Sequence, residues 1–574
     1  MGLTKRLPEG SAVGAQSDAS GDENTAFMRG RDEEGGLLSP SGKSKGRSAL
    51  GYTALTLVMA VTAVCGVVAF FAHGVKREWG ASNVLNIVTW NIAAINNNPF
   101  EYWITHNDAD YNKLMADVES FISAPGARDV LVEQVFTPAM WVELKAEMRE
   151  RGWAGLEEVE AIWSQDYSKR SIIAGFLKDH SLGEKRLASM PDRITNTIRT
   201  ADAAGVAYRP TVINCFSGEM GTLPAWWAAW KRFMFHEPLA LPGASDKAKG
   251  PVWLGAAGLL QKIKRSKYPA VSEREENISI PLQTLAQAIF DAVLVHMVGA
   301  VSPGAKWQGL RKQMCDALNR KKDERTLEIL GTTYADASLV FLQETAAAFT
   351  HKAVASELGS RFHIVSAATP ESKRDQNSAV MLRKSFFRVA TVRDHTAAAS
   401  AAFDKSVPVA EGDLLVISVE DTLGRKYLLA SFHGDTNGLA TAPVLAAVDT
   451  LAKTMPTHKL VFGLDANVHA VAVPHKKAGV MQFAADYVAR GYTSCWGDSP
   501  DPLLATTYNA RTYLQPQLQK AAGSAEKASK GDRNPKDFIL FPSGAFTVLT
   551  TSKDNTGQRK CVHTWPRASP SRRP

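Results

Sequence analysis

Several apolar segments of this sequence end in a side chain that could bind a metal ion or a phosphate. The stretch VFGLDAN, residues 461–467, is apolar until Asp465 and Asn467. Because residues two apart in a strand point to the same face, a carboxylate and an amide would face one point in space there. Burying either group without a partner is unfavourable, so a polar turn after the strand is the alternative for this stretch alone.

The same arrangement recurs along the chain. The strand-like segments NIVTWN, SLVFLQE and YLLASFH end at Asn91, Glu344 and His433, and KDFILFP has Asp537 at its head. One or two carboxylates suffice for Mg²⁺, which keeps several of its waters. A metal ion neutralises charge on a phosphoryl group, and amides and a histidine can hold phosphate without adding negative charge. Together these residues predict metal-assisted phosphoryl transfer.

The order of these motifs resembles that of the endonuclease/exonuclease/phosphatase superfamily. Its members include deoxyribonuclease-I-like nucleases, apurinic endonucleases, inositol polyphosphate 5-phosphatases, neutral sphingomyelinases and deadenylases. The motifs TWNI, LQE, a strand ending in histidine, GLDAN and DFIL fall within residues 84–98 and 331–550. The resemblance implies an α/β fold, a four-layer α/β/β/α sandwich, with the site at one edge of the paired sheets.

The resemblance also implies a role for each residue. Glu344 would be the main Mg²⁺ ligand, with Mn²⁺ as an alternative ion, and Asn91 would help to order the ligands and the phosphate. His433 would contact the scissile phosphate. Asp465 would position or deprotonate the attacking water, and Asn467 would bind the phosphate oxygens.

The end of the chain departs from the family pattern. The resemblance gives Asp537 the role of orienting a closing histidine, but the family's Ser-Asp-His is absent. His563 lies beyond Asp537 without a preceding Ser-Asp, and residues 551–574 form an atypical tail in place of the final strand. An altered gene end, reduced activity, or substitution by His563 would each account for this, in that order of preference. A smaller departure is Leu464, which stands where glycine is commoner.

The spacing between the first two motifs is also unusual. Residues 99–330 separate them, which predicts an inserted, mainly helical subdomain with a short strand at 129–132. Glu133 in DVLVEQV is a competing metal ligand, but we prefer Glu344 because the strand-like NSAVMLRK follows it. Within the insertion, PAWWAAWKRFMF places three tryptophans at helical spacing. They predict a packed helix face, with a membrane-facing or substrate-covering element as the alternative.

One long apolar run lies near the start of the chain. Residues 49–72 contain no Lys, Arg, Asp or Glu and are long enough to span a bilayer as a single transmembrane helix. Residues 1–47, rich in Gly, Ser and charge, predict a disordered cytoplasmic tail. The positive-inside rule then places the body outside the cytosol, as a type II membrane protein with an extracellular or lumenal catalytic domain. The flanking charges are Arg29, Arg31, Lys43, Lys45 and Arg47 before the run, and Lys76 and Arg77 after it.

The leading hypothesis is therefore a membrane-anchored, Mg²⁺-dependent hydrolase of phosphoric esters. Its substrate could be nucleic acid, as for a nuclease or other phosphodiesterase, or a phospholipid or inositol phosphate, as for a phosphatase. The net charge of +8 is too small to decide between them. A basic loop before Asp537 could attract a polyanion or simply be solvated. The alternatives are a catalytically impaired binding module of the same fold, motivated by the missing Ser-Asp-His, and a scaffold built around the tryptophan-rich insertion. The basic residues of that loop are Lys520, Lys527, Lys530, Arg533 and Lys536.

Two further features bear on the compartment. The five cysteines lack metal-ligand spacing, and an oxidising lumen would permit disulfides that the sequence cannot pair. Asn277-Ile278-Ser279 is a glycosylation sequon and is compatible with lumenal exposure.

Overall fold

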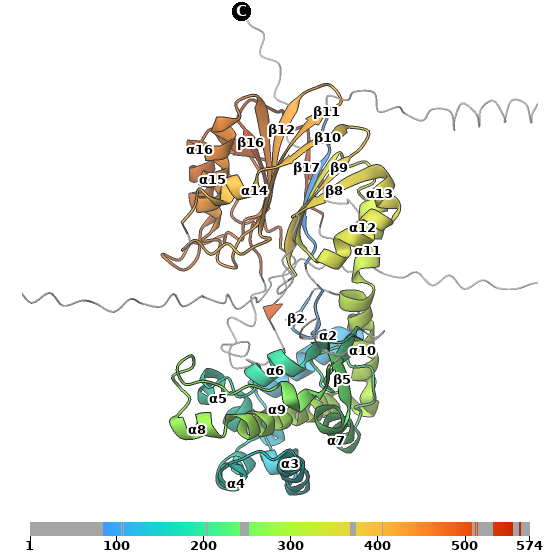
Figure 1. Cartoon of the computed structure of the whole chain (residues 1–574). Helices are drawn as coiled ribbons and strands as arrows, with labels where there is room; N and C mark the ends of the chain where they lie inside the picture. Colours follow the sequence, from blue (N-terminus) through green and yellow to red (C-terminus); the bar gives the residue numbers. More distant parts are fainter. Residues whose placement is uncertain are drawn as a thin grey trace, which may run out of the picture.

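The computed structural model of the chain describes residues 84–93, 95–104, 106, 108–201, 205–241, 252–367, 375–404, 406–507, 511–512, 514, 532–554 and 562–563. The predicted tail 1–47, the predicted transmembrane helix 49–72 and most of the basic loop before Asp537 lie outside these residues. The described chain forms a two-sheet unit (residues 84–91 and 322–554) and a helical unit (residues 95–321), placed end to end (Figure 1).

The two-sheet unit contains one four-stranded and one six-stranded sheet. The small sheet has the order β1 (Ile87–Asn91), β7 (Leu339–Thr345), β9 (Asn377–Arg383) and β8 (Phe362–Ser366). The large sheet has the order β10 (Phe387–Asp394), β11 (Leu414–Asp421), β12 (Lys426–His433), β13 (His458–Asp465), β16 (Asp537–Pro542) and β14 (Tyr492–Ser494). Only β1 with β7 and β12 with β13 are parallel; the other pairs are antiparallel.

The two sheets pack face to face through alternating apolar side chains. Phe341 of β7 and Leu429 of β12 belong to the shared core between them. Every residue of β7 is buried, which explains why its sequence reads as a continuous apolar run instead of an alternating one. Gly463 of β13 lies against this core, and a Cβ there would approach Phe341 Cδ2 to 2.3 Å. Only glycine therefore allows β13 to pack this closely against β7.

Helices cover both outer faces of the paired sheets (Figure 1). Val444, Phe483 and Leu464 share a core on the outside of the large sheet, and Leu330, Phe349 and Val340 share one on the outside of the small sheet. The helices on the large sheet are α14 (Thr396–Ser400), α15 (Thr441–Thr454) and α16 (Val480–Ala489). Those on the small sheet are α11 (Lys322–Thr332), α12 (Ala347–Ala355) and α13 (Glu357–Arg361). Helix α11 thus belongs to the two-sheet unit, although the sequence places residues 322–330 in the insertion.

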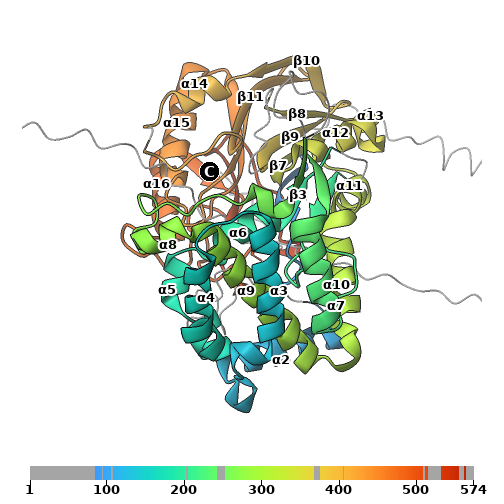
Figure 2. The same ribbon diagram turned by 60° about the horizontal axis from the view of Figure 1, so that its bottom comes forward.

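The helical unit has its own hydrophobic core. Its central helix is α9 (Ser279–Val301), which is apolar all round because neighbouring helices cover it on every side. It is the one helix of the described chain that is long and apolar enough to cross a membrane, and most of it is buried within this unit. Around it lie α2 (Ala109–Ser123), α3 (Pro138–Glu150), α4 (Leu156–Gln165), α5 (His180–Glu184), α6 (Ser189–Thr195), α7 (Leu223–Lys231), α8 (Glu273–Asn277) and α10 (Lys306–Cys315). Figure 2 brings these helices to the front.

Short strand pairs complete the structure. They are β2 (Tyr102–Trp103) with β15 (Arg511–Thr512), β3 (Thr197–Arg199) with β4 (Val206–Tyr208), β5 (Pro238–Leu241) with β6 (Val252–Gly255), and β17 (Thr551–Ser552) with β18 (Val562–His563). The strand predicted at 129–132 is wrong: Leu131 makes only an isolated bridge to Ser171, and a 3-10 helix, Val132–Gln134, follows. The alternative of a membrane-facing tryptophan helix also fails, because Trp226, Trp227 and Trp230 of α7 are buried.

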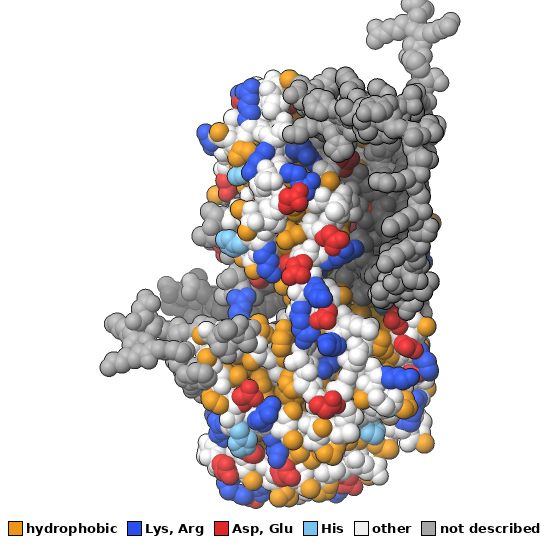
Figure 3. Space-filling view, turned by 90° about the vertical axis from the view of Figure 1, so that its right-hand side faces the viewer, with side chains coloured by type: hydrophobic (Ala, Val, Ile, Leu, Met, Phe, Trp, Pro, Cys, Tyr) orange, Lys and Arg blue, Asp and Glu red, His pale blue; other side chains and the backbone are white. Residues whose placement is uncertain are grey.

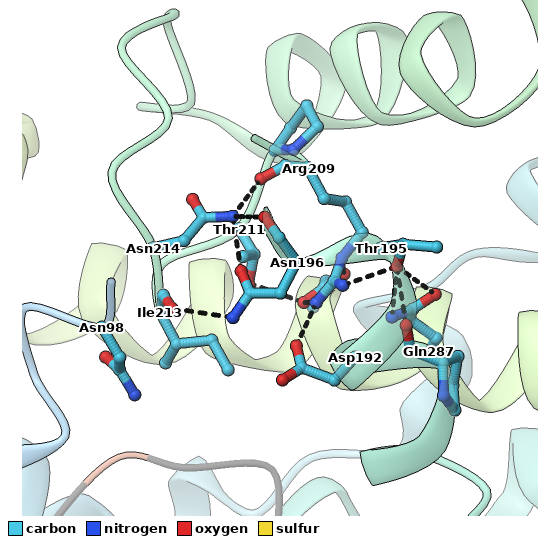
Figure 4. Close-up of polar contacts among 12 residues, drawn as sticks. Asn98, Asp192, Thr195, Asn196, Arg209, Thr211, Ile213, Asn214 and Gln287 are labelled. Carbon is cyan, nitrogen blue, oxygen red and sulfur yellow. Dashed lines mark hydrogen bonds and ion pairs between the residues drawn. The ribbon is translucent and has the colours of Figure 1, made fainter. Parts of the chain in front are cut away.

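A charged network is buried at the centre of the helical unit (Figure 4). Arg209, which is fully buried, donates to Asp291 Oδ2 at 2.8 Å, to Asp192 Oδ1 at 2.7 Å and to Thr195 Oγ1 at 2.8 Å. Burial raises the pKa of Asp192, while the charge of Arg209 opposes that rise. Trp230 of α7 adds a hydrogen bond to Asp291. These bonds connect α6, α7 and α9.

A disulfide joins two distant parts of the helical unit. Cys215 and Cys315 are bonded, with their Cα atoms 5.6 Å apart. Cys315 ends α10, and Cys215 lies in the loop that precedes α7. On the face seen in Figure 3, basic and acidic side chains are interspersed over both units. The net positive charge is therefore not concentrated there.

Candidate active site

The strand ends singled out in the sequence meet at the edge of the two-sheet unit that faces the helical unit. Asn91 of β1 is opposite Gln343 of β7, the residue before Glu344. In the large sheet, Asp465 of β13 lies between His433 of β12 and Asp537 of β16. The carboxyl ends of parallel strands share an edge, and Asp537 reaches the same edge because it begins an antiparallel strand.

Asn91 joins the two sheets at this edge. Its Nδ2 donates to Glu344 Oε1 at 2.9 Å and to Asp465 Oδ2 at 3.0 Å. Its Oδ1 accepts a hydrogen bond from the Ala93 backbone N at 2.8 Å, which fixes the amide orientation. All three polar residues are buried. One neutral amide thus holds a carboxylate from each sheet without adding a charge.

Glu344 has an unusual backbone. Its φ is 56°, and the register between β7 and β9 shifts between Leu342 and Thr345. Such a bulge redirects a side chain, and a non-glycine residue keeps a positive φ only where its surroundings enforce it. Here His433 Nε2 lies 3.2 Å from Glu344 Oε1, and Gln376 Nε2 donates to Glu344 Oε2 at 3.2 Å. Both carboxylate oxygens are therefore positioned.

A turn, and not the alternation of side chains along a strand, brings Asp465 and Asn467 together. Strand β13 ends at Asp465, and Asn467 has a φ of 48°, so strand alternation does not bring the two side chains together. Instead the Asn467 backbone N donates to Asp465 Oδ1 at 3.0 Å, in a tight turn of the kind that Asp and Asn favour. Asn467 Nδ2 binds the carbonyl of Gly434, next to His433. Asn467 Oδ1 is buried without a hydrogen-bond partner in the described part of the chain.

Asp537 is the most perturbed acid at this edge. Burial, and then the negative charge of Asp465, raise the pKa of Asp537 to about 7, while a hydrogen bond with Thr506 opposes the rise. The Asp537 carbonyl accepts from Trp496 Nε1 at 2.8 Å. No histidine bonds to Asp537 among the residues that the structure describes. His563 lies in β18 opposite Thr551, and its predicted role as a substitute for the closing histidine stays a prediction.

A cavity of about 730 Å³ lies beside β1 and extends to Asp537. β1 is an edge strand of the small sheet, and its first four residues are only partly buried. The cavity wall opposite β1 includes Ile539 of β16 and residues 545–554, which form no strand except at Thr551–Ser552.

Glu133, the competing metal ligand, does not belong to this cluster. Glu133 lies in the 3-10 helix Val132–Gln134 of the helical unit, and no described hydrogen bond or ion pair joins it to Asn91, His433 or Asp465. The geometry therefore favours Glu344. No group of three or more His, Cys, Asp or Glu residues in the described chain could hold a metal ion. The Glu344 carboxylate can serve an ion such as Mg²⁺ that keeps several waters. Asn91, expected as a second ligand, instead turns its Nδ2 toward Glu344 and its Oδ1 toward Ala93 N, so in this orientation it positions Glu344.

Several solved structures are similar to part of this chain. A D. rerio TDP2 complexed with a single-strand DNA product is 15% identical over 40% of this chain and 79% of that chain, with a TM-score of 0.26. An endonuclease/exonuclease/phosphatase family protein from Bacteroides thetaiotaomicron is 12% identical over 38% and 74%, with a TM-score of 0.26. This chain is similar to endonuclease/exonuclease/phosphatase-family proteins. The resemblance predicted from the motifs is confirmed.

A third solved structure and one family model also match part of the chain. The human Nocturnin catalytic domain with bound sulfate is 11% identical over 41% of this chain and 81% of that chain, with a TM-score of 0.27. At these identities the likeness concerns the fold alone. A family model described as a domain of unknown function (DUF8234) matches residues 129–312, within the helical unit. No curated protein sequence matches the chain.

Some site residues give no signal in the sequence. Three contacts come from residues that do not end an apolar strand. Gln376 contacts Glu344, Gly434 contacts Asn467, and Thr506 contacts Asp537. Gln376 directly precedes β9, where its partner on β7 is displaced by the bulge. Thr506 lies in a loop far from Asp537 in sequence. These contacts depend on loop conformation, so strand patterning does not reveal them.

Proposed function

We propose that this chain is a Mg²⁺-dependent hydrolase of phosphoric esters, anchored to a membrane by residues 49–72. The proposal rests chiefly on the buried cluster in which Asn91 bridges Glu344 and Asp465 while His433 contacts Glu344. We also infer a four-layer α/β/β/α sandwich into which the helical unit is inserted. The layers described above support this architecture.

The residues divide the chemistry between them. Glu344 would hold the metal ion, which when bound would neutralise charge on the phosphoryl oxygens, and Asn91 would orient the Glu344 carboxylate. Asp465 accepts hydrogen bonds from Asn91 and from the Asn467 backbone, so its carboxylate is fixed to orient a water and accept its proton. His433, partly exposed beside Glu344, can donate to a phosphate oxygen. Asp537, with its raised pKa, can hold a proton near neutral pH.

The test compares two glutamates. Glu344→Gln should abolish hydrolysis of bis(p-nitrophenyl) phosphate or p-nitrophenyl phosphate by the full chain, and chelation should do the same to the wild type. Glu133→Gln is the matched control and should retain activity, because Glu133 lies in the helical unit. The proposal would be refuted if the wild type hydrolysed the esters in the presence of a chelator and the Glu344→Gln variant hydrolysed them as well.

A second candidate is a binding module that retains the fold but not catalysis. The observation that favours it is the absence of a histidine on Asp537 within the described residues. It predicts that Mg²⁺ stabilises the protein against unfolding in a Glu344-dependent way without any turnover. Hydrolysis of either nitrophenyl ester would exclude it.

We further propose a type II orientation with the body outside the cytosol. The Cys215–Cys315 disulfide supports this, because disulfides persist mainly in oxidising compartments. The exposed Asn277 could also carry a glycan. Protease added to intact cells should digest the body and spare an N-terminal tag. Digestion of the tag with protection of the body would reverse the topology and restore cytosolic substrates.

A further inference from the structure

An exposed loop close to the active-site edge combines apolar and basic side chains. It consists of residues 471–477, VAVPHKK, and every one of these residues is exposed. Val471 is 76% exposed, and Val473 is exposed beside it. A solitary exposed valine is ordinary on a protein surface, whereas several exposed apolar side chains in one place mark an interaction surface.

The base of the 471–477 loop is held by hydrogen bonds on both sides. Ala470 N donates to Asn534 Oδ1 at 3.0 Å, in the segment that leads into β16. Ala478 N donates to Asn437 O at 2.9 Å, in the segment that follows β12. The loop is therefore fixed to the segments that precede Asp537 and follow His433, at the active-site edge of the large sheet.

Two further exposed apolar side chains belong to the segments that contact this loop. A Cβ on Gly479 would approach Ala472 Cβ to 2.8 Å, so the start of α16 lies against the loop. Met481, in the first turn of α16, is exposed. Leu439, in the segment that binds Ala478, is exposed as well. Together with the two valines of the loop, Met481 and Leu439 form what we call the apolar patch.

The charged side chains of the loop are all basic. Lys476 and Lys477 are exposed, and neither has an ion pair within the described part of the chain. Residues 466–485 contain no Asp or Glu. Of the carboxylates in the adjoining segments, Asp435 accepts a hydrogen bond from Ala440 N at 2.7 Å, and Asp532 pairs with a buried lysine at 2.8 Å. The two loop lysines are therefore available to an anionic partner.

An apolar patch bordered by two lysines fits the surface of a bilayer that contains anionic lipid. Apolar side chains enter the boundary between headgroups and acyl chains, while lysines are attracted to the negative surface. A protein partner fits less well, because lysine is depleted in protein–protein interfaces. A stable interface of that kind also takes about 20 to 30 residues a side, more than this loop and its neighbours supply.

The proposed anchor keeps this surface near a bilayer. The chain from Ala72, at the end of the predicted transmembrane helix, to Val84 can extend no further than about 40 Å. From Val84 through β1 to Asn91 the chain advances about 25 Å. The active-site edge is thus within reach of the membrane while the anchor stays in place.

We infer that the 471–477 loop and the apolar patch dock the active-site edge onto the surface of a bilayer that contains anionic phospholipid. The chain from Asn467 to Val471 spans at most about 14 Å, so docking brings this edge close to the lipid headgroups. The inference goes beyond the proposed hydrolase activity, because docking does not require turnover.

The experiment places a polarity-sensitive fluorophore on the loop of the full chain. The chain is reconstituted into nanodiscs of phosphatidylcholine alone or mixed with phosphatidylserine, and the fluorophore NBD is attached at Val471→Cys. In the anionic bilayer its emission should shift to the blue and be quenched by spin-labelled lipid, more strongly than in the neutral bilayer. The background carries Cys65→Ala, Cys495→Ala and Cys561→Ala, which leaves the disulfide cysteines in place.

A second labelling position is the matched control. Val142 of α3 is 65% exposed and lies in the helical unit, so a label at Val142→Cys should remain in water in both bilayers. A label at position 471 that also remains in water would overturn the inference and leave a protein partner for the patch. A chain that does not bind the nanodiscs overturns both the docking and the anchor. Hydrolysis of the nitrophenyl esters tests the proposed activity separately.

Charge variants separate the loop from the overall charge of the protein. Each lysine near an anionic surface strengthens binding about fivefold, so Lys476→Glu with Lys477→Glu should lower the ratio of docked to undocked loop by about 25-fold or more. Lys262→Glu with Lys264→Glu changes the net charge equally at exposed positions of the helical unit and should leave the ratio unchanged. Equal effects of the two pairs would contradict the inference.

A variant of the apolar patch tests the other half of the surface. Val473→Asp should reduce lipid quenching of the label at position 471 in both bilayers, because it removes an apolar side chain and adds a negative charge. All these substitutions are at exposed positions, so melting curves should match those of the parent chain. Unchanged quenching in the folded Val473→Asp variant would show that the apolar patch does not enter the bilayer.

Discussion

Asn91 offers the sharpest test of the site geometry, because one side chain bridges the two sheets. Asn91→Ala removes two hydrogen bonds, to Glu344 Oε1 at 2.9 Å and to Asp465 Oδ2 at 3.0 Å. A hydrogen bond to a charged group contributes about 1.5 to 3 kcal/mol, so their loss should destabilise the attachment of β1 to β7 and β13 together by about 3 kcal/mol or more. The two carboxylates are also left facing each other without the shared donor.

Hydrogen exchange in the presence of a chelator measures this effect locally, which matters because a chain of two units need not unfold in one step. A loss of about 3 kcal/mol corresponds to more than a hundredfold faster exchange of the β1 amides, at about 1.4 kcal/mol per factor of ten. The matched control is Asn86→Ala, at the other end of the same strand. Asn86 Nδ2 donates to a neutral carbonyl, Asp336 O, at 3.3 Å, so about 1 kcal/mol is expected.

If Asn91→Ala loses no more protection from hydrogen exchange than Asn86→Ala, the Asn91 bridge between the sheets does not stabilise the active-site edge. In that case the close contact of Glu344 and Asp465 with one amide would need another explanation. Repeating the exchange with Mg²⁺ in place of the chelator then tests the proposed cation site separately. A cation at the site should increase protection from exchange more strongly in the wild type than in Asn91→Ala, which lacks the amide that orients Glu344.

Two further predictions concern stability. Burial and neighbouring charge raise the pKa of Asp537 to about 7, so the folded state binds more protons than the unfolded state between about pH 4 and pH 7. The free energy of unfolding should therefore fall as pH rises through that window. Asp537→Asn should flatten this decline in denaturation curves recorded from pH 5 to 8, and an equally steep decline in the variant would exclude Asp537 as its source. In the helical unit, Arg209→Met leaves Asp192 and Asp291 buried without their cation and should destabilise by about 3 to 5 kcal/mol. Arg232→Met, at an exposed pair with Glu237, should change stability by less than about 1 kcal/mol, and equal melting temperatures for the two variants would contradict this.

The sequence alone predicts the elements that carry the site. Asn91, Glu344, His433 and Asp465 each end an apolar run, because a buried strand must become polar where it leaves the core. Strand alternation and apolar length depend only on local sequence, so β7, β9, β11, β12, β13 and β16 could be expected from pattern alone. The order of the motifs then implied a family, and the common edge followed from the family's fold.

The tertiary structure decided what these residues contact. The bulge at Glu344 and the turn at Asn467 set the direction of both side chains, and each depends on partners far away in the chain, such as Gln376 and Gly434. Local patterning holds no information on such contacts, which is why alternation gave the wrong reason for the meeting of Asp465 and Asn467. The pairing of Cys215 with Cys315 has the same origin.

The relation between the two units is likewise a property of the folded chain. The spacing between the first two motifs predicts an insertion of helices, but it does not reveal that Leu514, hundreds of residues later, packs into its core. A single leucine in a polar stretch gives no periodic signal, and its burial follows only from the loop that carries it across to Phe100. The sequence therefore determined which groups could perform the chemistry. Their mutual distances were decided by packing between segments that are remote in the chain.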